Sequence, residues 1–139
     1  MTEKIKVAFQ GEMGAYSHLA CLEVFPDIEA VGCSTFEEVF ELAENDPKYK
    51  IVIPIENSLA GRVADIHYLI PRYKLQIHSE HFQKVNHNLL GVKDSKINDI
   101  KTVRSHSQAI GQCRKIIMEN NLKAIISADT AGSAQYISK

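Results

Sequence analysis

The chain has 139 residues, of which 45% are hydrophobic and 24% are charged, so it has the composition of an ordinary globular protein that can bury a core. Its formal net charge is -1 and its lysines and arginines are scattered, which argues against a nucleic-acid-binding protein or one that binds an anionic membrane surface. One or two small domains are the limit at this length.

The first half of the chain predicts three strand–helix units, the pattern of an α/β domain with a mainly parallel sheet. Strands are expected at 4–9, 29–33 and 51–55, where short apolar runs occur. Helices are expected at 16–25 and 35–45, and a third follows residue 61, where Val63, Ile66, Leu69 and Ile70 line one side. Ser34 with Glu37 predicts a capping box at the second helix.

The second half breaks this alternation and then resumes it. Two further strands are predicted at 75–82 and 88–92, with no helix between them, so we place a lobe boundary here and assign residues 1–78 and 79–139 to two lobes. A strand at 102–105, a helix at 108–120, a strand at 123–127 and a last helix capped by Asp129 follow. This last helix has no stop signal before Lys139, so we expect the second lobe to be incomplete.

Cysteine usage and the start of the chain bear on its location. Cys21, Cys33 and Cys113 are far apart and contain no Cys-x-x-Cys pair, so we expect reduced, buried thiols rather than disulfides or a zinc site. No apolar stretch is long enough for a signal peptide or a membrane span. A cytoplasmic protein is the expectation.

Polar and glycine-rich loops follow three of the predicted strands, where α/β folds place ligands. They are Gln10-Gly-Glu-Met-Gly-Ala-Tyr-Ser17, Pro54-Ile-Glu-Asn-Ser-Leu-Ala-Gly-Arg62 and Arg104-Ser-His-Ser-Gln108. In the second loop, Asn57 and Ser58 suit ligand binding, but they equally suit capping of the next helix. Arg62 is either a cation beside a bound anion or a solvated residue at a helix start. In the third, Gln108 and Gln112 share a helical face.

Taken in order, these three segments resemble prephenate dehydratases. The resemblance covers residues 4–138 and rests on Gln-Gly-x-x-Gly-x-Tyr-Ser, Pro-Ile-Glu-Asn-Ser and Ser-His-x-Gln, with Gln112-Cys113 after them. It implies a two-lobed α/β fold similar to type II periplasmic binding proteins, with mainly parallel sheets, flanking helices and a cleft between the lobes. It also implies a lyase that converts prephenate to phenylpyruvate in phenylalanine biosynthesis, without a cofactor, and a homodimer or larger homo-oligomer.

The resemblance also implies the site residues. Those at the catalytic positions are Asn57, Ser105 and Gln112. Those expected to border the substrate are Gly14, Ala15, Tyr16, Ser17, Glu56, Ser58, His106, Gln108, Thr130, Ala131 and Gly132. Tyr16 equally suits packing in the core, and Glu56 suits a structural role because a carboxyl must be desolvated to stay protonated at neutral pH. Amides at the helix starts near Gly14 and Thr130 are expected to hold the substrate carboxylate that survives the reaction.

One part of the family pattern has no counterpart here. The family's catalytic threonine stands in a Thr-Arg-Phe motif, and no Thr-Arg pair occurs in this sequence. The alternative interpretation is therefore a catalytically incomplete module that binds small anions. The six histidines show no metal-ligand spacing, and His78 and His81 would face opposite sides of a strand, so no metal site is predicted.

Overall fold

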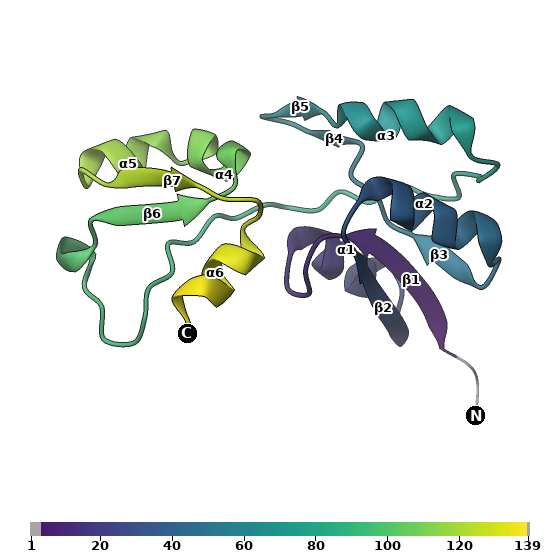
Figure 1. The fold of residues 1–139 in the computed structure, drawn as a ribbon, viewed down its shortest axis with the longest axis horizontal. Coiled ribbons are helices and arrows are strands. Elements are labelled where there is room, and N and C mark those ends of the chain that lie inside the picture. The colour runs from purple at the N-terminus through teal and green to yellow at the C-terminus, as the bar shows by residue number, and fades with distance from the viewer. Residues whose placement is uncertain (1–3, 139) are drawn as a thin grey trace. The chain divides into compact units, whose positions relative to one another are not determined.

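The computed structural model describes residues 4–138. The chain divides into two compact units after Lys84, whereas the sequence places the lobe boundary after residue 78. Both units combine parallel strands with flanking helices (Figure 1), so the predicted α/β class is confirmed. Among the described residues, none of the helices has both the length and the apolar composition needed to cross a bilayer.

A three-stranded parallel sheet of order β2-β1-β3 is the centre of the first unit. Its strands are β1 (Ile5–Gln10), β2 (Ile28–Cys33) and β3 (Tyr49–Ile51), connected through α1 (Tyr16–Val24) and α2 (Phe36–Asn45). The third strand was predicted at 51–55 and begins earlier, but the Val52 amide still donates to the Ala8 carbonyl at 3.0 Å. Pro54, which has no amide hydrogen, cannot extend that ladder.

Alternation along β1 sends its side chains to two different cores. Val7 and Phe9 pack with Cys21 of α1 on one face of the sheet, and Ala8 packs with Cys33 and Val39 of α2 on the other. All of these side chains are buried, and burial raises the pKa of the Cys21 thiol to about 11. The sheet is therefore covered by helices on both faces, as parallel sheets require.

The cap of α2 lies one residue later than the sequence predicts. The Thr35 hydroxyl accepts a hydrogen bond from the Glu38 amide at 3.2 Å, and the Glu38 carboxylate accepts one from the Ser34 amide at 2.8 Å. The predicted pairing of Ser34 with Glu37 was wrong because the helix begins at Phe36, which makes Thr35 the N-cap.

A small hairpin and a short helix complete the packing of the first unit. The hairpin strands are β4 (Glu56–Asn57) and β5 (Gly61–Arg62), in a segment predicted as loop, and α3 (Ala64–Leu69) continues into a 3-10 turn at Ile70–Arg72. Ile66 and Leu69 of α3 pack with Phe40 of α2 in a third buried cluster. The hairpin is therefore followed directly by α3, a helix anchored in the core of the first unit.

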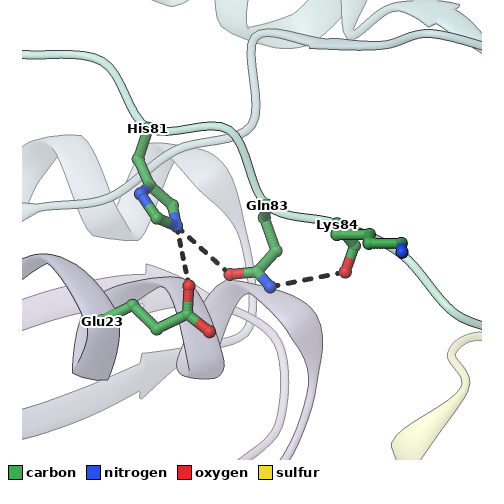
Figure 2. Close-up of polar contacts among 4 residues, drawn as sticks. All are labelled: Glu23, His81, Gln83 and Lys84. Atoms are coloured by element: carbon green, nitrogen blue, oxygen red, sulfur yellow. Dashed lines mark hydrogen bonds and ion pairs between the residues drawn. The ribbon is translucent and has the colours of Figure 1, made fainter.

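No strand forms at 75–82 or 88–92, so both of these predictions were wrong. Instead, residues 74–84, which belong to the first unit, are held to it by side-chain hydrogen bonds. The Lys74 amide donates to the Glu44 carboxylate at 3.1 Å, and the His81 ring contacts the Glu23 carboxylate of α1 at 3.1 Å. Figure 2 shows His81 contacting Gln83 as well, whose own amide donates to the Lys84 carbonyl.

The second unit is built on two parallel strands, β6 (Thr102–Ser105) and β7 (Lys123–Ile126), both close to their predicted positions. A 3-10 turn at Ile97–Asp99 precedes them, and α6 (Ala131–Ile137) follows them. The single helix predicted at 108–120 is two helices, α4 (Ser107–Gln112) and α5 (Arg114–Glu119), separated at Cys113. Lys139, the predicted end of the last helix, lies outside the described residues.

Candidate functional site

The predicted site residues lie in both units, and each set is described within its own unit. In the first unit they follow β1 and β3, and in the second they follow β6 and β7. All four segments therefore start at the carboxyl ends of parallel strands, and three of them are the loops singled out in the sequence.

The loop after β1 is shaped by glycine. Gly11 and Gly14 adopt φ angles of +115° and +91°, which other residues rarely adopt. The Gly11 amide donates to the Cys33 carbonyl at 2.9 Å, which fixes this loop to the end of β2. A Cβ atom at Gly32 would lie 2.7 Å from the Gly11 carbonyl oxygen, so β2 needs a glycine where the loop crosses it.

The helix start after this loop already uses one of the amides proposed to hold an anion. The Gly14 amide donates to the Nδ1 atom of His18 at 3.0 Å, and the His18 ring stacks on Phe9 with 5.5 Å between ring centroids. A substrate carboxylate at Gly14 must therefore displace an existing hydrogen bond. Ala15, the N-cap residue, provides no side-chain cap, and Tyr16 and Ser17 are half-buried at the first turn.

Asn57 organises the hairpin after β3. Its Oδ1 atom accepts hydrogen bonds from the amides of Leu59 and Ala60, each at 2.9 Å, and Gly61 closes the turn with a φ of +81°. This is the geometry of an Asx turn, in which the side chain replaces a backbone acceptor. The N-cap of α3 is Val63, so neither Asn57 nor Ser58 caps that helix.

Glu56 and Arg62 occupy opposite positions in this hairpin. They are paired across the two antiparallel strands, and both are exposed. Opposite charges in such a pair attract across the ribbon. This backbone pairing is consistent with a structural role for Glu56 in the hairpin.

In the second unit, Ser105 ends β6 and His106 begins the next helix. Ser105 is half-buried, and its carbonyl accepts a hydrogen bond from the Ser127 amide at 3.0 Å, which continues the ladder between β6 and β7. The Nδ1 atom of His106 accepts one from the Gln108 amide at 3.3 Å. His106 therefore caps α4, and Gln108 contributes its backbone to that cap.

Gln112 is the last residue of α4, and its side-chain oxygen lies 2.7 Å from the Nε2 atom of His87. Gln112 is half-buried, whereas Gln108, one turn earlier, is exposed. None of the three loop motifs contains His87. Periodicity has no signal for a contact between residues 25 positions apart, one of them in an extended segment.

The loop after β7 is held by its own side chains. The Asp129 carboxylate accepts a hydrogen bond from the Gly132 amide, and a Cβ atom at Gly132 would lie 2.8 Å from that carboxylate. The buried Ser133 hydroxyl donates to the Asp129 carbonyl at 2.7 Å and pairs with the Ser127 hydroxyl at 2.8 Å. The Asp129 carboxylate thus occupies the helix start where Thr130, Ala131 and Gly132 were expected to meet an anion.

The described residues contain no group of three or more His, Cys, Asp or Glu side chains arranged to hold a metal ion, and three of the histidines make contacts within the protein. His18 stacks on Phe9, His106 caps α4, and His81 contacts Glu23. The predicted arrangement of His78 and His81 on a strand was wrong, since the segment forms none.

The sequence matches the family model for prephenate dehydratase over residues 7–139. The chain belongs to the prephenate dehydratase family. An arogenate dehydratase/prephenate dehydratase from the chloroplast of Arabidopsis thaliana is 42% identical over 135 residues, which are 97% of this chain and 34% of that protein. A bifunctional N-acyl-homoserine lactone acylase/prephenate dehydratase from Komagataeibacter europaeus is 41% identical over 131 residues, 94% of this chain and 47% of that protein.

The fold comparison agrees with the family. The crystal structure of a prephenate dehydratase from Staphylococcus aureus superposes with a TM-score of 0.80 at 26% identity, covering 96% of this chain and 51% of that one. The fold is thus that of prephenate dehydratase domains, which is similar to that of periplasmic binding proteins. This chain spans about half, or less, of the length of the relatives it matches.

Proposed function

We propose that this chain carries out, as part of a prephenate dehydratase, the conversion of prephenate to phenylpyruvate in L-phenylalanine biosynthesis. The observation that carries the proposal is the family match over 7–139, together with the candidate residues at the carboxyl ends of the strands. The reaction removes carbon dioxide from one ring carbon and hydroxide from the opposite one. Aromatisation drives it, so no electron-accepting cofactor is required.

The chemical task is to help hydroxide leave. Hydroxide is a poor leaving group, so a hydrogen-bond donor at that oxygen lowers the barrier, by about 10²- to 10⁴-fold in typical general acid catalysis. A cation held on the carboxylate that is lost would stabilise the ground state and slow the reaction. Neutral amides and hydroxyls therefore suit this reaction.

We assign these neutral groups to Asn57, Ser105 and Gln112. In this proposal Asn57 and Gln112 orient prephenate, and Ser105 donates a hydrogen bond or holds a water molecule. Supporting this assignment, Asn57, Ser105 and Gln112 are half-buried at the ends of their elements. The other predicted residues border the substrate, with the amide of Gly14 exchanging His18 for a carboxylate.

The remaining features of the proposal follow the family. We propose a cytoplasmic protein that acts on free prephenate as a homodimer or larger homo-oligomer. The Arabidopsis relative named above is chloroplastic, so location varies within the family. The catalytic threonine of the family has no counterpart in this sequence.

Two other functions are tested in the same experiment. The relative named as a bifunctional acylase, at 41% identity, makes hydrolysis of N-acyl-homoserine lactones a second candidate. A non-catalytic module that binds small anions is the third.

The experiment measures phenylpyruvate formed from prephenate by the 139-residue chain, beside a version extended through any downstream Thr-Arg-Phe sequence. Activity of the short chain means that another donor, such as Ser105, replaces the threonine. Activity of the extended chain alone makes residues 1–139 a catalytically incomplete part. Hydrolysis of the amide bond of an N-acyl-homoserine lactone by either version, with release of the acyl chain and without phenylpyruvate, supports the acylase. Binding of prephenate without turnover supports the module.

A further inference from the structure

We propose that His87 is a positioning residue, which holds the side-chain amide of Gln112 in one orientation. The proposal rests on the function proposed above, since Gln112 is one of the residues expected to orient prephenate. Its basis is the contact of 2.7 Å between the His87 Nε2 atom and the Gln112 side-chain oxygen, both within the second unit. None of the sequence motifs includes His87.

Hydrogen-bond chemistry fixes which group donates. The side-chain oxygen of glutamine only accepts, so His87 must donate from Nε2. A neutral imidazole carries one ring proton, and this contact therefore selects the tautomer protonated on Nε2. With its oxygen toward His87, Gln112 directs its amide nitrogen, which donates, to the opposite side. A donor in a fixed direction can hold an oxygen atom of prephenate, which is the orienting role proposed for Gln112.

Gln112 stands at the end of its helix, where the contact with His87 adds a restraint on the side chain. It is the last residue of α4, and Cys113 leaves the helix with φ -102° and ψ 13°. A glutamine side chain has several rotatable bonds, so holding one orientation carries an entropic cost. The hydrogen bond to His87 restricts the Gln112 side chain before substrate binds, so less conformational entropy is lost on binding. Supporting residues preorganise a site in this way.

The backbone on either side of His87 is also constrained. The side-chain amide of Asn88 donates to the carbonyl of Asn86 at 3.2 Å, which ties together the two residues that flank His87. The exposed His87 therefore stands between two residues that are hydrogen-bonded to each other. The segment around His87, which forms no strand, thereby contributes to the position of Gln112.

The first test compares two substitutions in whichever version of the protein forms phenylpyruvate. His87→Leu removes the donor and should lower kcat about 10- to 100-fold with a much smaller change in KM, as expected for a misplaced group. His87→Gln keeps a donor nitrogen and should retain most of the activity. In a Gln112→Ala background, His87→Leu should have no further effect. Independent, multiplying losses would show that His87 does not act through Gln112.

The second test needs no activity. In the 139-residue chain, 15N NMR should find His87 protonated on Nε2 when it is neutral, and His87→Leu should shift the side-chain amide signals of Gln112. His78→Leu, which changes an exposed histidine in the other unit, should leave them in place. Unmoved Gln112 signals in His87→Leu reject the positioning role. Absence of phenylpyruvate from both the 139-residue chain and its extended version rejects the proposed function instead, so the two failures are distinguishable.

Discussion

Asn57 has a structural duty besides any contact with substrate. Its side-chain oxygen satisfies the amides of both Leu59 and Ala60, so removing it leaves two donors of the hairpin without their acceptor. A loss of turnover in Asn57→Ala would therefore mix a misplaced hairpin with a missing amide. A substitution that keeps the oxygen separates the two.

Asn57→Asp should fold as stably as the wild type, because aspartate also accepts the two turn hydrogen bonds. Asn57→Ala should lose about 1 to 2 kcal/mol of unfolding free energy, measured with urea, since a hydrogen bond contributes about 0.5 to 1.5 kcal/mol. Both variants should turn over prephenate slowly if the amide nitrogen matters. Wild-type turnover in Asn57→Asp would show that only the turn is needed.

We expect substitution by alanine to change the free energy of unfolding in opposite directions at Gly32 and at Gly111. Gly32→Ala places a methyl group 2.7 Å from the Gly11 carbonyl oxygen, and this backbone atom cannot easily move. We expect a loss of roughly 1 to 3 kcal/mol, as in other overpacked sites. Gly111→Ala meets nothing within 4 Å and lies in α4, so it should gain up to about 1 kcal/mol. Equal effects in urea unfolding would contradict the steric argument.

At the scale of elements, the start of α2 distinguishes two neighbouring hydroxyls. Thr35→Ala removes the side-chain acceptor of the Glu38 amide and should cost about 1 kcal/mol of stability. Ser34 contributes its backbone amide to the Glu38 carboxylate, which alanine keeps, so Ser34→Ala should be close to neutral. If thermal unfolding ranked the two the other way, the cap would belong to Ser34, as the sequence pattern suggested.

Elements with a local hydrophobic periodicity could be predicted from the sequence. Elements that depend on hydrogen bonds from a neighbouring strand could not. β1 alternates Val7, Ala8 and Phe9 between two cores, and this period is visible in the sequence. The segment at 75–92 carries apolar residues such as Ile77 and Phe82, which favour strands, yet they are 77% and 85% exposed and no neighbouring strand pairs with them. A strand exists only where another supplies its hydrogen bonds, which composition does not reveal.

The candidate site shows the same division. Ser105 and His106 follow directly from a predicted strand end, so their places in the fold were predictable. The turn formed by Asn57 was missed, because a hairpin with two residues in each strand has too little alternation to detect. The contact of His87 with Gln112 depends on tertiary structure alone.

At the scale of the whole molecule, buried apolar residues are distributed unevenly. The three buried clusters all belong to the first unit, whereas Leu122 and Ser133 are the buried residues among those described in the second. Local stability follows buried contacts. The amides of β1 should therefore exchange with deuterium more slowly than those of β6, when peptides from both are followed by mass spectrometry. Equal protection would show that the second unit is stabilised by something other than its own core.

The burial of two cysteines makes the third a selective chemical handle. Cys21 is fully buried and, with a pKa of about 11, roughly one in ten thousand of its thiols is ionised at pH 7. Cys33 is buried as well, whereas Cys113 is half-buried, beside Gln112. Under native conditions a fluorinated alkylating reagent should mark Cys113 first, while urea should open all three to it. The native sequence can thus carry a fluorine label at Cys113, next to Gln112, without an introduced cysteine. The resonance of that fluorine can then report ligand binding near Gln112.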